Sequence, residues 1–161
     1  MPDVFALLMD DHRTVEGLFS QFEQSQDPGV AMQICDELTV HSLLEEELVY
    51  PIVATKLGTG LANEARHEHQ EAKQLVSQIE AGVAAGNDVS GLVQQLKESV
   101  DHHVQEEESE LFPKMQEALP GLVTELGDDV VERKQTLQAQ LAEARSLGQG
   151  SAVVTQKPYN S

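Results

Sequence analysis

The sequence predicts an all-α protein: an antiparallel up-down four-helix bundle with an additional C-terminal helix. Apolar residues recur at intervals of three and four positions through four long segments, the spacing of a helix that buries one face. Residues typical of turns separate these segments. A chain of 161 residues can form one domain with its own core, and because aromatic residues make up only 4% of it, that core must be aliphatic.

The first two helices form the first half of the bundle. In the first helix, the residues on the face expected to be buried are Phe5, Leu8, His12, Val15, Phe19 and Phe22. In the second helix they are Ile34, Leu38, His41, Glu45, Leu48 and Ile52. The turn signal Asp27-Pro28-Gly29 separates the two helices. Pro51 is expected to bend the second helix, because a proline inside a helix removes one backbone hydrogen bond.

The third and fourth helices repeat this arrangement. In the third helix the buried face is expected to carry Ala65, His69, Ala72, Val76, Ile79 and Val83. In the fourth it carries Val93, Leu96, Val100, His103, Glu107, Glu110 and Leu111. Turn signals at residues 58–60 and 86–88 bound the third helix, and Pro113 is expected to bend the fourth as Pro51 bends the second. The bundle therefore spans residues 3–118, with an internal repeat of residues 3–57 and 60–118.

The C-terminal part of the chain is expected to lie outside the bundle. Residues 128–147 have a weak apolar stripe at helical spacing: Val131, Lys134, Leu137, Leu141 and Ala144. We expect this additional helix to dock on the surface of the bundle. Residues 148–161 turn to Gly, Ser, Gln and Pro, so we expect a flexible tail.

Polar residues interrupt the apolar stripes in the same pattern twice. Each copy has a lone His and then His-x-x-x-Glu, followed by an aromatic residue and a proline; the six residues are His12, His41, Glu45, His69, His103 and Glu107. A His and a Glu four apart lie on one helix face. Counted from the turns, the four His lie within about 3 Å of one level along the bundle. We predict that the six side chains converge, and buried polar groups at such density need a partner.

Four imidazoles and two carboxylates favour iron, manganese or zinc over calcium, which prefers oxygen ligands alone. If Glu45 and Glu107 each bridge two ions, the six residues fill about eight of the twelve positions of two octahedral ions. An oxo or hydroxo bridge would take two more. At least one position then remains for a small molecule.

Four other residues have to be weighed against the six at this site. His102 and Glu106 also stand four apart, but their helix face is polar, and the match of Phe112-Pro113 with Tyr50-Pro51 selects His103 and Glu107 instead. His67 is expected at the surface. Tyr50 lies opposite His41 in helical phase and is expected to pack, unless the bend at Pro51 turns it inward.

The repeated pattern resembles the hemerythrin-like, HHE cation-binding domain family over residues 3–118, and the additional helix and tail resemble small actinobacterial hemerythrin-like proteins. The resemblance implies a non-haem centre of two iron ions, oxo- or hydroxo-bridged and held by the six residues. Oxygen-carrying relatives have a second His on the third helix, but here the candidate positions are Ala65 and Lys73. Glu16 and Glu110 are the possible replacement ligands.

The expected function is catalase-like decomposition of hydrogen peroxide, because the family that the sequence resembles includes proteins with this activity. The alternative is a module that binds or senses dioxygen or nitric oxide, or an iron-responsive protein. The net charge of −18 argues against nucleic acid and anionic membrane surfaces as partners. A single cysteine, no basic leader and no apolar run near the roughly 20 residues of a membrane span indicate a cytoplasmic protein.

Overall fold

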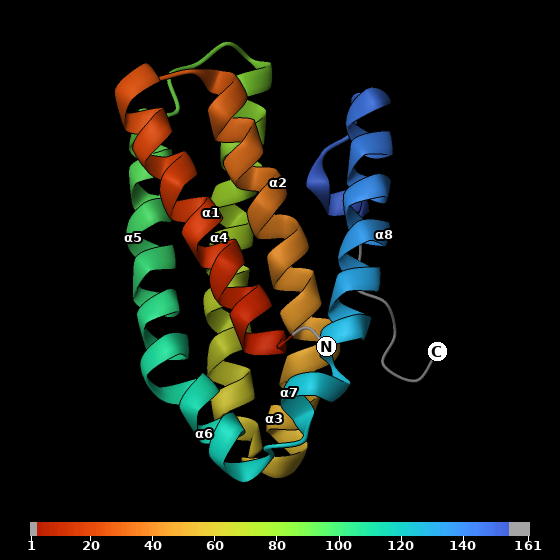
Figure 1. The fold of residues 1–161 in the computed structure, drawn as a ribbon. Helices are drawn as coiled ribbons and strands as arrows, with labels where there is room; N and C mark the ends of the chain where they lie inside the picture. Colours follow the sequence, from red (N-terminus) through yellow and green to blue (C-terminus); the bar gives the residue numbers. More distant parts are fainter. Residues whose placement is uncertain (1–2, 155–161) are drawn as a thin grey trace.

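The computed structural model describes residues 3–154, except the side chains of residues 123 and 124. Four helical columns run antiparallel to one another (Figure 1). They are α1 (Val4–Ser25); α2 (Pro28–Leu44) continued by η1 (Glu45–Val49) and α3 (Tyr50–Lys56); α4 (Thr59–Ala84); and α5 (Ser90–Glu106) continued by η2 (Glu107–Leu111) and α6 (Phe112–Ala118). The predicted all-α four-helix bundle is confirmed.

Local signals in the sequence end and restart the helices where expected. After α1, Gln26 adopts a left-handed conformation with φ of 53°, and the Asp27 carboxylate accepts a hydrogen bond from the backbone N–H of Gly29. Pro28 occupies the start of α2, where its missing N–H costs nothing. Between α3 and α4, Gly58 has φ of 105°, a conformation that favours glycine.

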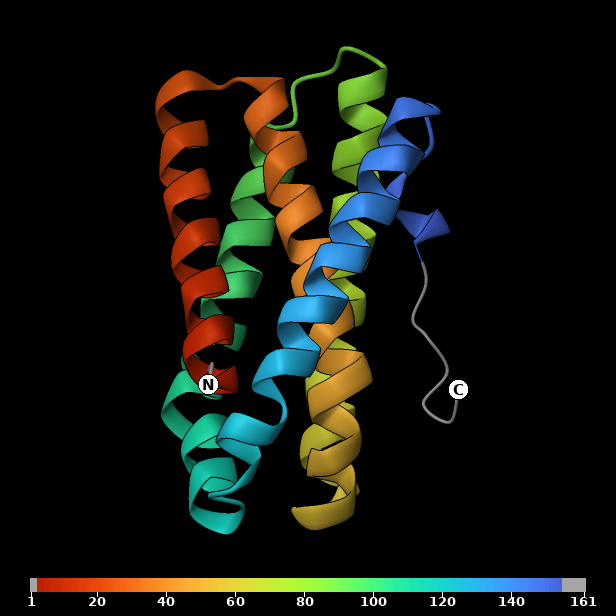
Figure 2. The ribbon, with the colours of Figure 1, turned by 45° about the vertical axis from the view of Figure 1, so that its right-hand side comes forward.

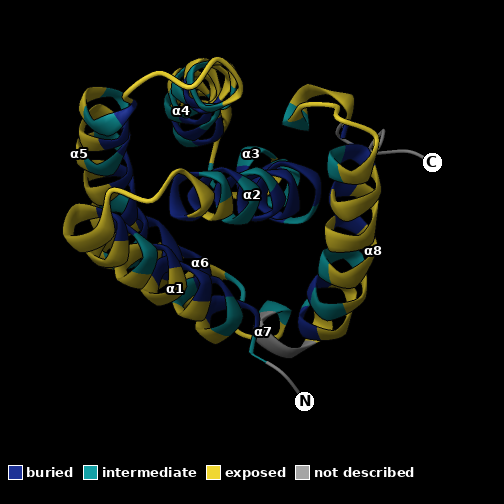
Figure 3. Ribbon diagram, turned by 90° about the horizontal axis from the view of Figure 1, so that it is seen from above, coloured by how far each residue is buried: buried dark blue, intermediate teal, exposed yellow. Residues whose placement is uncertain are grey.

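The core consists of two apolar clusters with a polar layer between them. One cluster lies towards the α1–α2 turn and includes Phe19, Ile34 and Ile79. The other lies towards the opposite end and includes Phe5 and Phe112, whose ring centroids are 5.1 Å apart. Figure 3 shows the buried faces of α1, α2, α4 and α5 turned towards one another. The polar layer is therefore enclosed by apolar packing along the bundle axis.

The bends expected at the two prolines take the form of wide helical turns before them. Segments η1 and η2 have π-helical hydrogen bonding, with Tyr50 N–H donating to the carbonyl of Glu45 and Phe112 N–H to that of Glu107. A regular α-helix would press the ring of each proline against the carbonyl four residues earlier, and a wide turn relieves that contact.

These wide turns change which residues face the core. The stripe in the sequence placed Leu48 and Ile52 on the buried face, but both are only half-buried. Val49 and Val53 are buried instead, with exposed fractions of 1% and 0%. The expectation for these four positions was wrong by one residue, because a π turn takes up one residue more than an α turn.

The additional helix is confirmed as α8 (Gly127–Ser146), which follows the short α7 (Leu122–Glu125) and packs along the outside of α2 (Figure 2). Its buried residues are Val130, Leu137, Leu141 and Ala144. Near its C-terminal end, Arg145 donates to Asp36 of α2 at 2.7 Å and also pairs with Glu80 of α4. Apolar contact and ion pairs together hold α8 against the bundle.

The residues expected to begin a flexible tail are docked as far as the structure describes them. Segment η3 (Ser151–Val153) lies against α4, where Glu80 accepts hydrogen bonds from the backbone N–H and hydroxyl of Ser151, at 2.9 and 2.8 Å. Val154 is buried. The tail expected from residue 148 thus begins with a segment that contacts the bundle, and residues 155–161 lie outside the described residues. Within residues 3–154, no helix has the length and apolar character to cross a membrane.

Candidate metal centre

The six residues predicted from the repeat converge in the polar layer. All are buried, with exposed fractions between 0% for Glu45 and 9% for His103. They form two groups of possible metal ligands: His12, His41 and Glu107 in one, and Glu45, His69 and His103 in the other. The ligand atoms of each group lie within 4.8 Å of one another. The four helical columns therefore bring both copies of the sequence motif to one level.

Within each group, two imidazoles face each other through the same ring atom. The Nε2 atoms of His12 and His41 are 3.2 Å apart, and those of His69 and His103 are 3.1 Å apart. Two nitrogen ligands at right angles, each about 2.1 Å from one ion, would lie about 3 Å apart. Each histidine pair is thus spaced to bind one cation.

The two carboxylates connect the groups. Glu107 has Oε1 at 3.2 Å from His12 Nε2 and Oε2 at 3.4 Å from His103 Nε2, so its two oxygens serve different groups. Glu45 Oε1 lies 3.0 Å from His41 Nε2 and 3.2 Å from His69 Nε2. Each carboxylate is therefore placed to bridge two ions.

The charge balance of this layer fits bound cations. Among the described residues, both oxygens of Glu45 and Oε1 of Glu107 are buried without a hydrogen-bond partner, an arrangement that is costly in a core. Burial works to raise the pKa of Glu45, but the charge of His41 holds it well below its usual value. Burial likewise opposes a proton on His41, but the charge of Glu45 raises the pKa of His41 to about 10. The raised pKa of His41 shows that this layer favours positive charge, which a bound cation would also supply.

A second layer of carboxylates supports the histidines, and the sequence reasoning missed it. The Nδ1 atoms face His12–Glu108 at 2.7 Å, His41–Asp11 at 3.1 Å, His103–Glu68 at 2.8 Å and His69–Glu46 at 3.9 Å. The first three contacts are hydrogen bonds, which fix the ring orientation and leave Nε2 free for a metal, whereas Nδ1 of His69 makes no hydrogen bond and Glu46 lies beyond that distance. The signal in the sequence was an acidic residue beside a ligand at equivalent places in both repeats: before His12 and His69, and after Glu45 and Glu107.

Cations hold several of these carboxylates in turn. Lys73 contacts Glu46 at 3.0 Å, and Arg13 pairs with Glu108. Lys134 of α8 donates to Asp11 at 2.6 Å. The additional helix therefore contributes directly to the support of the centre.

Tyr50 is the main site residue whose position the helical phase predicted wrongly. Its hydroxyl lies 3.0 Å from His69 Nε2 and 3.2 Å from His103 Nε2, and it donates to Glu107 Oε2 at 3.0 Å. The wide turn of η1 rotates this position inward. Of the two alternatives for Tyr50, packing away from the centre or turning inward at the bend, the structure shows the second. Burial, and then the charge of Glu107, raise the pKa of Tyr50 well above its usual value.

The repeat-related position holds Phe112, so the two halves of the centre differ. The Phe112 ring is stacked on the His12 ring, with centroids 6.1 Å apart and an interplanar angle of 7°. One histidine pair therefore has a phenol beside it, and the other has an aromatic hydrocarbon.

The structure does not bring the two possible additional ligands into the centre. Glu16 is exposed and pairs with Arg13 at 3.5 Å, which holds it at the surface. Glu110 is also exposed, and together with Lys114 it lines a small cavity between α4 and the α5–η2–α6 column. His67 and His102 lie at the surface as expected, with side chains 76% and 65% exposed.

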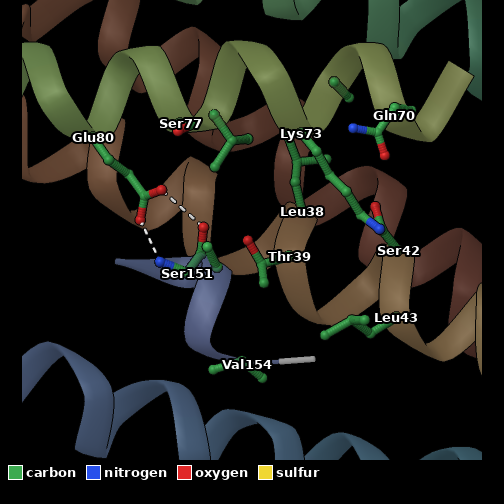
Figure 4. Close-up of a pocket in the computed structure, with 13 residues that line it drawn as sticks. Leu38, Thr39, Ser42, Leu43, Gln70, Lys73, Ser77, Glu80, Ser151 and Val154 are labelled. Atoms are coloured by element: carbon green, nitrogen blue, oxygen red, sulfur yellow. Dashed lines mark hydrogen bonds between the residues drawn. The ribbon is translucent and has the colours of Figure 1, made fainter. Parts of the chain in front are cut away.

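Two neighbouring cavities lie on one side of the ligand layer. The inner cavity, of about 30 Å³, is lined by the four ligand histidines and by apolar residues that include Val15 and Val100. That volume holds one small molecule, since a water needs roughly 10–15 Å³. An outer cavity of about 340 Å³ lies between α2, α4 and Ser151–Val154 (Figure 4). Leu38, Ser42 and Ala72 line both cavities.

Comparison with known proteins agrees with this arrangement. The sequence matches the hemerythrin HHE cation binding domain over residues 3–115. A protein described as a DNA nickase from Nostoc sp. (strain PCC 7120 / SAG 25.82 / UTEX 2576) is 37% identical over 119 residues, which are 71% of this chain and 34% of that protein. A protein described as an uncharacterized hemerythrin-like protein from Schizosaccharomyces pombe (strain 972 / ATCC 24843) is 29% identical over 119 residues, 70% of this chain and 59% of that protein.

The chain thus spans about a third and about three fifths of the lengths of these two relatives. No solved structure gives a significant match. The family match covers well over half of the chain and contains all six residues of the two ligand groups. The chain therefore belongs to the hemerythrin HHE cation-binding domain family.

Proposed function

We propose that the two groups hold two iron ions, joined by an oxo or hydroxo bridge, and that this centre decomposes hydrogen peroxide. The observation that carries the proposal is the placement of Glu45 and Glu107, each within 3.5 Å of histidines from both groups. The proposed ligands are His12, His41, Glu45, His69, His103 and Glu107. Two bridging carboxylates in a helical bundle are typical of dinuclear carboxylate sites.

When bound, a pair of iron ions supplies the two-electron exchange that turns two hydrogen peroxide molecules into one dioxygen and two waters. The chain supplies binding, proton transfer and shelter. Tyr50 O–H donates to Glu107 Oε2, so a proton is held at the edge of the ligand layer. The apolar lining of the inner cavity limits access of bulk water to the histidines.

An open coordination position is part of the proposal. Ala65, four residues before His69, is 6% exposed and carries no ligand atom. Lys73, four residues after His69, is paired with Glu46 instead. Glu16 and Glu110 lie at the surface, so neither of them replaces the histidine that oxygen-carrying relatives have. This leaves room for peroxide beside the bridging carboxylates.

Metal analysis and an oxygen electrode test the proposal. Protein produced with ample iron should contain about two iron atoms per chain and show an oxo-to-iron band in the near ultraviolet. It should release dioxygen from hydrogen peroxide over many turnovers, whereas protein stripped of metal should not. One zinc per chain without that band would overturn the di-iron assignment.

The second candidate is a module that binds or senses dioxygen or nitric oxide, or an iron-responsive protein. The apolar inner cavity favours it, because a neutral diatomic molecule suits such a lining. The reduced protein distinguishes the two functions when exposed to air. A lasting, reversible oxygen adduct without peroxide turnover would select the binding function, and oxidation without an adduct supports the peroxide function. The Ala65→His substitution should make the reduced protein form the reversible oxygen adduct more readily.

The description of the Nostoc relative as a DNA nickase is not extended to this chain. The similarity covers 34% of that protein. The net charge of −18 opposes binding to a phosphate backbone, so we propose small molecules rather than nucleic acid as partners. Cys35, the single cysteine, is buried, which suits the reducing cytoplasm in which we propose the protein acts.

A further inference from the structure

A third group of possible ligands lies at the surface, beside the buried centre. It consists of Glu68 on α4 and His102 and Glu106 on α5, whose ligand atoms lie within 4.8 Å of one another. We propose that these residues form an outer site for a divalent transition-metal ion, which collects the ion at the surface and supplies it to the buried centre. The supply role rests on the proposed function, whereas binding at the outer site does not.

The residue types and distances suit such an ion. His102 Nε2 lies 3.1 Å from Glu106 Oε1 and 3.6 Å from Glu68 Oε2. One imidazole with two carboxylates favours a transition metal over calcium or magnesium, which prefer oxygen ligands alone. The exposed fractions of 65% for His102 and 38% for Glu106 leave the remaining coordination positions to water. A site of this kind binds and releases its ion readily.

A cavity joins the outer group to the buried ligands. It has a volume of about 70 Å³, and its lining includes Glu68 and Glu106 of the outer group as well as His103 and Glu107 of the centre. Glu107 is only 1% exposed, and its Oε1 has no hydrogen-bond partner among the described residues. The cavity therefore places two carboxylates of the outer group and two buried ligands of the centre on one shared space.

The charge of this cavity favours cations. Glu64 and Glu110 also line it, so four carboxylates surround the outer part, against the single ammonium of Lys114. A small cavity with walls of one charge concentrates ions of the opposite charge. Ala65 lines the same cavity, and its short side chain leaves this space open.

Glu68 connects the two sites through its two oxygens. Its Oε1 accepts a hydrogen bond from Nδ1 of His103 at 2.8 Å, and its Oε2 faces His102. The inner oxygen can therefore keep its histidine while the outer oxygen binds an ion.

The chain offers a matched control. His67 and Glu71 also stand four apart on an exposed helix face, with His67 Nε2 at 3.3 Å from Glu71 Oε1. This pair belongs to none of the three ligand groups found in the described residues. It repeats the spacing and exposure of His102 and Glu106, but among the described residues it has no third ligand group member beside it.

The test is a titration of the metal-free full chain with Co²⁺, followed by equilibrium dialysis and stopped-flow absorbance. Wild-type protein should bind three Co²⁺ ions, the third most weakly. His102→Ala and Glu106→Gln should bind two, and at limiting Co²⁺ should fill them about tenfold more slowly. His67→Ala should match the wild type in both measurements.

The two parts of the inference fail separately. Equal stoichiometry in wild type and His102→Ala would overturn the outer site. Loss of the third ion without slower filling would support the outer site and overturn its supply role. If the wild type binds a single ion that His102→Ala loses, the outer site stands, and the dinuclear centre of the proposed function fails.

Discussion

At the scale of single residues, the centre is built from repeated parts that differ at one informative position. The two repeats supply equivalent histidines, carboxylates that we propose bridge the ions, and supporting carboxylates. They diverge at Tyr50 and Phe112, which follow the two wide turns. The phenol lies against the His69–His103 pair, whereas the Phe112 ring stacks on His12. The two metal positions should therefore differ in reactivity.

Tyr50→Phe tests that difference. The variant keeps the buried ring but loses the hydroxyl that lies about 3 Å from His69 and Glu107. We expect two iron ions per chain, an altered optical spectrum, and roughly 100-fold slower dioxygen release from peroxide, because proton transfer by a positioned side chain typically contributes about 10²- to 10⁴-fold. Iron analysis, an absorption spectrum and an oxygen electrode measure these three quantities. Unchanged turnover and spectrum would remove Tyr50 from the reaction.

His103→Ala and His102→Ala distinguish the buried pair from its exposed neighbour. His103→Ala removes a buried ligand, so we expect the affinity for the two inner ions to fall by more than about 100-fold, with lower resistance to urea. His102→Ala should keep both inner ions and its stability. Metal analysis and urea unfolding measure the outcome, and the reverse result would mean that the wrong His–Glu pair has been assigned to the centre.

Cys35 gives a prediction that depends on pH. Burial raises the pKa of its thiol to about 12, against roughly 8.5 in an unfolded chain. The folded state therefore keeps its proton where the unfolded state loses it, so the contribution of this group to stability is complete below about pH 8.5 and is lost as the pH rises towards 12. At pH 8 a thiol reagent should label Cys35 quickly in denaturant and hardly at all without it. Rapid labelling of native protein would contradict this burial.

At the scale of elements, the wide turns and α8 adapt a regular bundle to its centre. The wide turns start at Glu45 and Glu107, the two carboxylates proposed to bridge the ions, and they change the phase of the helix beyond. Helix α8 supplies Lys134 to Asp11, which in turn accepts from His41. A helix outside the bundle thus orients a ligand inside it.

Lys134→Met tests this connection. It would leave Asp11, only 4% exposed, without its ammonium partner. Because Lys134 itself is 33% exposed, water screens part of the effect, and we expect a loss of about 1–2 kcal/mol in the free energy of unfolding. Weaker metal binding should accompany it. Lys97→Met removes a surface partner of Glu23 and serves as the control, which should change neither urea unfolding nor metal content.

At the scale of the whole molecule, the polar layer divides the core in two. Apolar clusters lie on both sides of it along the bundle axis, so most of the layer is shielded from bulk water. Burial of four imidazoles and two carboxylates opposes folding, and bound cations offset that cost. Metal and fold should therefore be linked.

Metal removal measures that linkage. A bound ion stabilises the folded state by about 2.7 kcal/mol when its free concentration is 100 times its dissociation constant. We expect the chelated protein to unfold at lower urea concentration and lower temperature than the loaded protein, while it stays helical before the transition. Circular dichroism measures the helical content and follows the urea and thermal unfolding of both forms. Superimposable unfolding curves, with metal loss verified by elemental analysis, would show that the centre does not contribute to stability.

The sequence alone determined the helices, their turns and the residues that converge. Each of these depends on spacing along one helix: apolar stripes mark the buried faces, and a His and a Glu four apart in both repeats mark the ligand layer. Outside the wide turns, regular α-helical geometry carries that spacing into three dimensions. The four histidines therefore meet at one level of the bundle, as counting residues from the turns predicted: His12, His41, His69 and His103.

Only the tertiary structure decided the rest. The one-residue phase change of η1 brought Tyr50 into the centre and replaced Leu48 by Val49 in the core, because a proline changed the helical period locally. The pairing of Asp11 with His41 and of Glu108 with His12 joins different helices. Their partners depend on how the helices pack and rotate against one another, which periodicity along a single helix does not specify.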